Sequence, residues 1–249
     1  MEWLLDHAET YRTQLRSGPF FQHLARAQRP GDLRWVHQLF HQSRDFTQAL
    51  CLRYSLCRDG RYQRVFAEHA SGEADHPDLL AAWMSTHGFL DGAEPGDVPP
   101  TPATSETLAF CWRSAVREPC DVQVVALNVL SEGVALDFYS AVIPVLDQLE
   151  VLTGRYWSVH GEINPHHLRL GLDLCGEVAA DSPTGLLYQR VLWHGANLYH
   201  QMLSSWVGER AEPLTALWTE DAPRRLSMEP QPRSTFAEGT VRMPRPAKP

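Results

Sequence analysis

Three short segments of the chain place acidic and imidazole side chains where they could bind a divalent metal ion. The sequence HGEINPHH puts His160, Asn164 and His167 at the i, i+4, i+7 spacing of one helical face. Glu73 and His76 form a Glu-x-x-His pair, whose spacing would put a carboxylate and an imidazole on the same face of a helix. Ligands of these two kinds, without thiolate, suit iron or manganese.

The third segment, ALNVLSEGVALDFY, surrounds Glu132 with apolar residues on nearly every side. Carboxylates are rarely buried unless they are paired or bind a metal. Each segment also has an ordinary alternative, because Glu73 could cap a helix and Glu132 could face solvent. Taken together, the three segments predict one interior site of two carboxylates and three imidazoles, with Asn164 beside them.

The spacing of apolar residues predicts that helices position these segments. The helical patterns cover residues 33–56, 76–88, 105–116, 121–152 and 181–209. Ser105 is a candidate N-cap, Asp181 or Ser182 another, and Gly88 a candidate C-terminal residue. Pro144 should kink or end the helix that contains it. Alternating strand patterns are absent, so the sequence predicts an all-α bundle of about seven to nine helices.

Composition is typical of one globular domain. The chain has 249 residues, of which 43% are hydrophobic, and we expect a helical domain over residues 1–220. Residues 221–249 contain six prolines and little apolar periodicity, which predicts a disordered tail. A Pro- and Gly-rich connector lies at residues 91–106.

Charge and targeting signals limit the partners that we expect. The net charge is −8, and residues 221–249 carry +3, which leaves −11 on residues 1–220. Such an acidic body argues against a nucleic-acid partner. No uninterrupted apolar run reaches the roughly 18 residues of a membrane span. The N-terminal sequence MEWLLDHAET does not resemble a signal peptide, so we expect no membrane partner and a cytoplasmic location.

Two other residue classes have ordinary interpretations. The five cysteines are scattered without a CxxC pair, which favours buried, reduced thiols. Arg53, Arg58, Arg61 and Arg64 crowd the stretch before the first motif. A solvated face is the default interpretation of these arginines, and an anchor for a substrate carboxylate is the alternative.

The order of the three motifs resembles that of the haem-oxygenase-like di-iron oxidases and oxygenases. The segments GEADHPDLLAAWMSTHG, ALNVLSEGVALDFY and HGEINPHH give Glu-x-x-His, then a lone Glu-Gly, then paired histidines about thirty residues further on. The resemblance spans roughly residues 33–210, and the third motif with its distance from Glu132 is its most specific part. It implies a haem-oxygenase-like bundle that binds two Fe(II) ions and activates O2 without haem.

The resemblance also assigns the ligands. Those that match the family's iron ligands are Glu73, His76, Glu132, His160 and His167. Glu132 is expected to be the catalytic carboxylate that bridges or spans the two ions. Asn164 stands where the family has Asp, and a neutral amide is the weaker ligand, so one ion should be weakly held. Pro165 could break the helix there.

By the same resemblance, the protein is an O2-dependent enzyme for a small amino-acid, amine or fatty-acid-like substrate, often within natural-product biosynthesis. The substrate pocket is expected between the helices of Glu73 and Glu132. Its expected lining residues are Phe66, Trp83, Phe138 and Tyr139. The resemblance allows an external electron donor and a homodimer as partners.

Two alternatives stay open from the sequence. A degenerate member of the family, with one iron or none, could bind a small molecule or a carrier protein. A metal-free enzyme, similar to thiaminases or quinone-cofactor synthases, could use Cys111 or Cys175 as its nucleophile.

Overall fold

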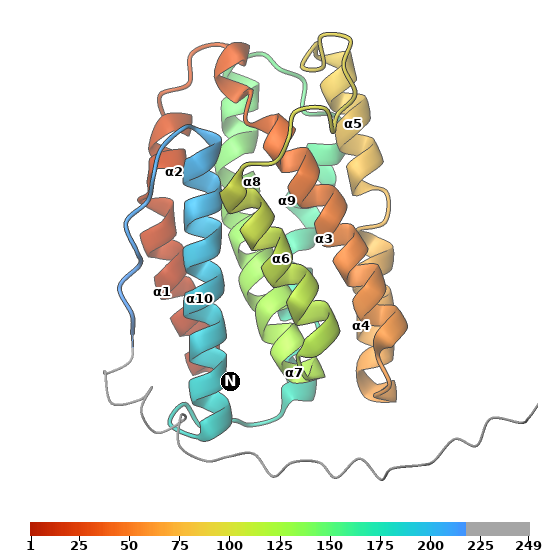
Figure 1. Cartoon of the computed structure of the whole chain (residues 1–249), viewed down its shortest axis with the longest axis vertical. Coiled ribbons are helices and arrows are strands. Elements are labelled where there is room, and N and C mark those ends of the chain that lie inside the picture. Colours follow the sequence, from red (N-terminus) through yellow and green to blue (C-terminus); the bar gives the residue numbers. More distant parts are fainter. Residues whose placement is uncertain (218–249) are drawn as a thin grey trace, which may run out of the picture. The chain divides into compact units, whose positions relative to one another are not determined.

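The computed structural model describes residues 1–217, apart from the side chains of residues 161–165. The predicted tail, residues 221–249, lies outside the described residues. Residues 1–217 contain helices and no strand, which confirms the all-α prediction. The long helices lie side by side along the length of the bundle (Figure 1).

The α-helices and shorter helical segments have the following bounds: α1 (Glu2–Arg16), α2 (Pro19–Leu24), η1 (Pro30–Leu33), α3 (Val36–Leu56), α4 (Gly60–Gly72), α5 (His76–Thr86), α6 (Pro102–Arg117), α7 (Cys120–Gln123), η2 (Val124–Leu130), α8 (Ser131–Gln148), α9 (Gly154–Arg169), η3 (Leu172–Cys175) and α10 (Pro183–Trp206). The segments η1 and η3 are 3-10 helices, whereas η2 is a π-helix. Because α7, η2 and α8 follow one another without a break, residues 1–217 contain nine separate helices besides the 3-10 turns. This number lies within the predicted range.

The continuous helix Cys120–Gln148 is the centre of the bundle. Every residue from 122 to 134 on it is buried, and it contacts α1, α6, α9 and α10 (Figure 1). Among the described residues it is the one helix long and apolar enough to cross a membrane, but 61% of its apolar window is buried inside the bundle. A core helix meets the same criteria of length and composition, and its burial here fits that role.

The predicted helix ends are partly correct. Ser182 caps α10 by accepting a hydrogen bond from the Gly185 amide, as its position predicted. Gly88, with a φ of +73°, follows α5 in the left-handed conformation expected just beyond a helix end. Ser105 is not the cap of α6, because Thr101 takes that role and accepts from the Thr104 amide.

Pro144 does not end its helix, since α8 continues to Gln148. Proline removes the hydrogen bond to the carbonyl group four residues earlier, which here belongs to Ser140. Ser140 and Pro144 are both exposed, so water can hydrate the freed carbonyl. The cost of proline inside a helix is therefore smaller here than it would be in the core.

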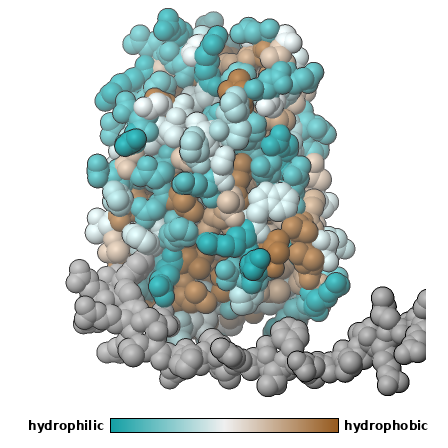
Figure 2. Space-filling model, in the orientation of Figure 1, coloured by the Kyte–Doolittle hydropathy of each residue, from teal (hydrophilic) through white to brown (hydrophobic). Residues whose placement is uncertain are grey.

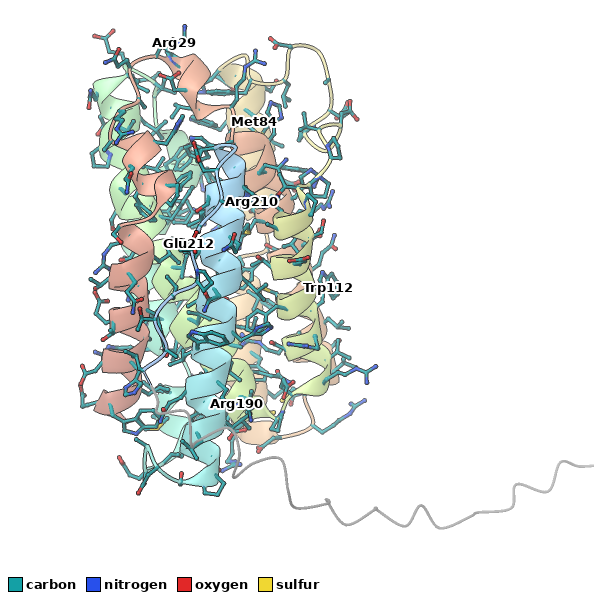
Figure 3. The ribbon with its side chains drawn as sticks, turned by 60° about the vertical axis from the view of Figure 1, so that its left-hand side comes forward. Arg29, Met84, Trp112, Arg190, Arg210 and Glu212 are labelled. Atoms are coloured by element: carbon teal, nitrogen blue, oxygen red, sulfur yellow. The ribbon has the colours of Figure 1, made fainter. Side chains whose placement is uncertain are left out.

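Helix α10 lies between α1 and α6 and contacts both (Figure 3). The segment after α10 returns along it, where Asn197 binds the Leu214 amide and Trp193 donates to the Leu214 carbonyl. Hydrophilic and neutral side chains occupy most of the face drawn in Figure 2, with apolar residues exposed among them. The larger part of the apolar residues is buried in the core of the bundle.

A buried ion pair joins α1 to α8. Arg12 donates two hydrogen bonds to Asp137, at 2.8 and 2.6 Å, and both side chains are about nine-tenths buried. Arg16 adds a third contact to Asp137 at 2.8 Å. Breaking a buried ion pair on one side leaves the other charge without compensation.

We expect Asp137→Ala to lower the free energy of unfolding by about 3 kcal/mol, because it leaves the buried Arg12 charge with only its 3.1 Å contact to half-exposed Glu9. Asp147→Ala, which removes an exposed carboxylate from the same helix, is the control and should cost less than about 0.5 kcal/mol. Equilibrium urea unfolding measures both. Equal losses in the two variants would contradict the role given to the ion pair.

Candidate metal centre

Side chains from four helices meet inside the bundle. Glu73 follows the last residue of α4, His76 is the first residue of α5, Glu132 lies in the first turn of α8, and His160 and His167 lie on α9. The prediction that Glu73 and His76 share one helical face is wrong, because residues 73–75 form a turn between α4 and α5. This turn nevertheless directs both side chains inward, where each is at most 5% exposed.

Glu73, His76 and His160 form the first group of potential ligands. Their ligand atoms lie within 4.8 Å of one another. Glu73 Oε2 contacts His76 Nδ1, and the rings of His76 and His160 are 4.2 Å apart. His160 Nδ1 donates to the carbonyl of Tyr156 at 2.7 Å, which leaves Nε2 with its lone pair. Metal-binding histidines are typically oriented by a hydrogen bond of this kind.

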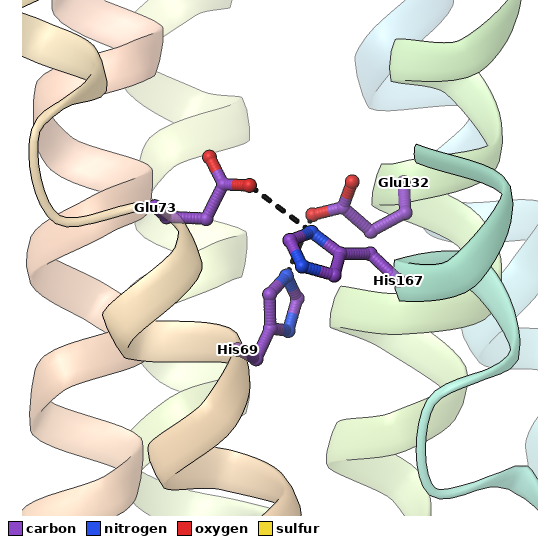
Figure 4. Close-up of side chains that lie close together, drawn as sticks. All are labelled: His69, Glu73, Glu132 and His167. Carbon is purple, nitrogen blue, oxygen red and sulfur yellow. Dashed lines mark hydrogen bonds and ion pairs between the residues drawn. The ribbon is translucent and has the colours of Figure 1, made fainter. Parts of the chain in front are cut away.

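His69, Glu73, Glu132 and His167 form the second group, also within 4.8 Å (Figure 4). His69 Nε2 lies 2.8 Å from Glu132 Oε1, and His167 Nδ1 lies 3.1 Å from Glu73 Oε1. The His167 ring packs closely against α4, since a Cβ atom at Gly72 would lie 3.0 Å from it. Glu73 is therefore the side chain that the two groups share, whereas the family resemblance assigns the bridging role to Glu132.

Burial and neighbouring charges shift the pKa values of the two carboxylates in opposite directions. Burial alone would raise the pKa of Glu73, but the contacts with His167 and His76 outweigh it and hold this pKa below its usual range. Burial and the nearby charge of Glu73 raise the pKa of Glu132 well above its usual value. Burial and the proximity of His76 lower the pKa of His160 to about 4, so its ring is neutral, the form that binds metals.

Two buried atoms of the potential metal ligands lack a hydrogen-bond partner among the described residues. They are Glu73 Oε1 and His167 Nδ1, which lie 3.1 Å apart without hydrogen-bond geometry. Polar atoms left unpaired in a protein interior are costly and rare. A divalent cation that coordinated both atoms would remove this cost, so the residues present fit a metal ion.

The helix that carries the third motif is continuous. α9 runs from Gly154 to Arg169, so Pro165 does not break it. The side chain of Asn164 lies outside the described residues, as does that of Glu162. His166 is exposed and contacts Glu68 at 2.8 Å, as expected for a residue off the ligand face.

Three buried polar residues lie beside the candidate ligands but were not predicted to belong to the metal centre. His69 is fully buried, and Arg53 and Asn128 lie beside it, also with 0% exposure. The interpretation of Arg53 as part of a solvated face is therefore wrong. The signal that was available is helical spacing, because His69 precedes Glu73 by four residues and Asn128 precedes Glu132 by four.

Two small cavities adjoin the centre. One, of about 20 Å³, reaches Glu73, Glu132 and His160. The other, of about 30 Å³, is lined by Phe138 and by apolar residues of α3, α8 and α10. Both are lined by Gln42, Ser131, Ala135 and Tyr139, so these residues lie between the cavities.

Two of the four residues predicted to line the substrate pocket lie elsewhere. Phe138 and Tyr139 line the cavities, and the Tyr139 ring stacks on His160 at 3.9 Å. Phe66 instead packs under the Arg53 guanidinium at 4.1 Å. Trp83 packs against Trp157 and donates to the carbonyl of Leu152. Neither ring lines either cavity.

Comparison with solved structures identifies the fold of the described bundle as haem-oxygenase-like. It is similar to a domain of unknown function with a haem oxygenase-like fold from Shewanella denitrificans OS217, with a TM-score of 0.62 and 16% identity over 80% of this chain and 88% of that one. A TenA homolog from Pseudomonas syringae pv. tomato DC3000 gives a TM-score of 0.64 and 13% identity over 83% and 91% of the two chains. Curated proteins give no match.

The family described as iron-containing redox enzymes matches residues 33–212. The chain therefore belongs to the family of iron-containing redox enzymes. This result confirms the resemblance inferred from the three motifs, and the structural similarity confirms the predicted fold.

The two cysteines that could serve as nucleophiles are both at least partly buried, and Cys111 is inaccessible. Cys111 is fully buried, 3.6 Å from the hydroxyl of Tyr199, and burial raises the pKa of its thiol to about 11. Burial also raises the pKa of the Cys175 thiol to about 11. At neutral pH both sulfurs are protonated and poorly nucleophilic.

We therefore expect a thiol-blocking reagent at pH 7.5 to modify exposed Cys51 in the folded protein and to leave Cys111 unmodified. Mass spectrometry of proteolytic peptides measures the modification at each site. A urea-unfolded sample, in which both thiols should react, is the control. Rapid modification of Cys111 in the folded protein would restore it as a candidate nucleophile.

Proposed function

We propose that the protein is a non-haem di-iron oxidoreductase that uses O2 to oxidise a small molecule. The observation that carries the proposal is the shared carboxylate, because Glu73 belongs to both groups of buried ligand atoms. Membership of the iron-containing redox enzymes supports iron as the metal. Two carboxylates and neutral imidazoles also match the ligand types found in di-iron helical bundles.

The residues divide between two ions. Glu73, His76 and His160 would hold the first ion, and Glu73, Glu132 and His167 would hold the second. The amide of Asn164 would complete the second site in place of a carboxylate, so this ion would be held more weakly. Bound Fe(II) would supply the electrons that reduce O2, and an external donor would restore them.

The substrate would occupy the two cavities once they join. Each has room for little more than a water molecule. Movement of Tyr139, which lines both, would connect the apolar cavity near Phe138 with the metal centre. A molecule with an apolar body would then place its reacting carbon near the ions.

Charge favours a substrate that carries a carboxylate. Two Fe(II) ions bring four positive charges, and the described ligands contribute only the carboxylates of Glu73 and Glu132. Buried charges need compensation. Among the predicted classes, an amino acid or a fatty-acid-like substrate therefore fits better than an amine, and we propose natural-product biosynthesis in the cytoplasm as the setting.

A metal-free, thiaminase-like enzyme is the alternative suggested by the fold of the TenA homolog. None of the cysteines belongs to either ligand group of the described residues, and the Cys111 thiol is buried. A metal-free enzyme would also leave Glu73 Oε1 and His167 Nδ1 without partners in the core. These observations favour the iron enzyme.

We expect the wild-type protein, reconstituted with Fe(II) under anaerobic conditions, to retain about two iron ions per chain. Glu73→Gln should retain almost none, because it removes the carboxylate common to both groups. Elemental analysis after desalting measures the ratio. Glu68→Gln, an exposed change on α4, the helix that precedes Glu73, is the control and should retain wild-type iron. The proposal would be refuted if the wild-type protein retained no more iron than Glu73→Gln.

Asn164→Asp tests the weak second site. We expect it to tighten binding of the more weakly held ion by at least about tenfold, because an anionic oxygen attracts a nearby dication by several kcal/mol more than a neutral amide does. Stepwise anaerobic titration with Fe(II) measures both affinities. An unchanged second affinity would show that residue 164 does not contribute a ligand.

A further inference from the structure

Arg53 and Asn128 determine which nitrogen of His69 carries a proton. Arg53 Nη2 lies 2.8 Å from His69 Nδ1, and Arg53 Nη1 donates to Asn128 Oδ1 at 2.8 Å. A guanidinium group has five N–H donors and no acceptor. Its contact with His69 Nδ1 therefore requires a lone pair on that nitrogen.

Asn128 leads to the same conclusion. Because its Oδ1 accepts from Arg53, its Nδ2 faces His69 Nδ1 at 2.9 Å and the carbonyl of His167 at 3.0 Å. A flipped amide would turn an N–H toward the guanidinium, where no acceptor exists. Two donors thus meet at His69 Nδ1, which excludes a proton on that atom and excludes the doubly protonated ring.

The proton of the neutral ring must then lie on Nε2, 2.8 Å from Glu132 Oε1. His69 donates a hydrogen bond to Glu132, and Nε2 has no lone pair to offer to a metal. His160 shows the opposite arrangement, since its Nδ1 donates to the Tyr156 carbonyl and its Nε2 is free. His69 and His160 therefore have different tautomers and different uses.

We infer that His69 is a positioning residue that holds Glu132 and is not a metal ligand, an inference that rests on the proposed metal centre. His69 binds one oxygen of Glu132 and leaves the other for an ion. The guanidinium of Arg53, stacked on Phe66 at 4.1 Å, keeps the His69 ring in the required tautomer. The second ion would then be held by Glu73, Glu132 and His167.

The first test needs no metal. Two-bond ¹H–¹⁵N correlation spectra of the metal-free protein, assigned with His69→Gln, distinguish the two neutral tautomers of histidine. We expect His69 to be protonated on Nε2. A proton on Nδ1 would overturn the inference, whatever the protein does with iron.

The second test compares metal binding, with Co²⁺ as the probe and its visible absorption as the signal. Glutamine keeps an N–H donor for Glu132 and an acceptor for Arg53, so His69→Gln should bind as many Co²⁺ ions as wild type, within tenfold in affinity. His69→Leu keeps neither and should weaken binding about 10- to 100-fold. His76→Gln, which removes a proposed ligand, should lose one ion.

If His69→Gln bound one Co²⁺ ion fewer than wild type, and its visible spectrum changed as that of His76→Gln does, His69 would be a ligand. That result would overturn the inference. Thermal unfolding of each variant checks that it folds. If His69→Leu does not fold, the comparison of His69→Gln with wild type decides the question. Wild-type protein that binds no metal would refute the proposed function instead, while the tautomer measurement would still test the contact between His69 and Glu132.

Discussion

The burial of the Glu73 carboxylate is the constraint on which the centre depends. An ionised carboxylate is stable inside a protein only when other groups compensate its charge. Here two imidazoles contact it, one from α5 and one from α9, so the carboxylate ties three parts of the chain together. The turn at residues 73–75 is what makes this arrangement possible, because it lets neighbouring residues of α4 and α5 face the same interior point.

The central helix supplies the other half of the centre. Its π-helical part, η2, widens the turn just before Glu132, and π-helical turns occur frequently at functional sites. Asn128 lies within η2 and binds both His69 of α4 and the backbone of α9. The position of Glu132 is therefore fixed by polar contacts as well as by packing.

Local sequence patterns predicted most of the fold because apolar spacing determines which segments form helices. The candidate ligands were recognisable because charged residues interrupted apolar faces, as at Glu132. Arg53 was misread because its partners are distant in sequence: Asn128 lies 75 residues further along the chain. Phe66 and Trp83 were misplaced for a similar reason, since the direction of an aromatic ring depends on its tertiary contacts, here with Arg53 and Trp157.

Arg53 also affects the proposed difference in binding strength between the two ions. Burial lowers the pKa of its guanidinium to about 9, while the nearby Glu132 opposes this shift. A cation bound by Glu132 would be repelled by the positive charge of Arg53. Arg53 contacts His69, which belongs to the second group of potential ligand atoms and not to the first. In the proposed centre, the charge of Arg53 would therefore weaken the ion bound by Glu132 more than the ion bound by His76 and His160.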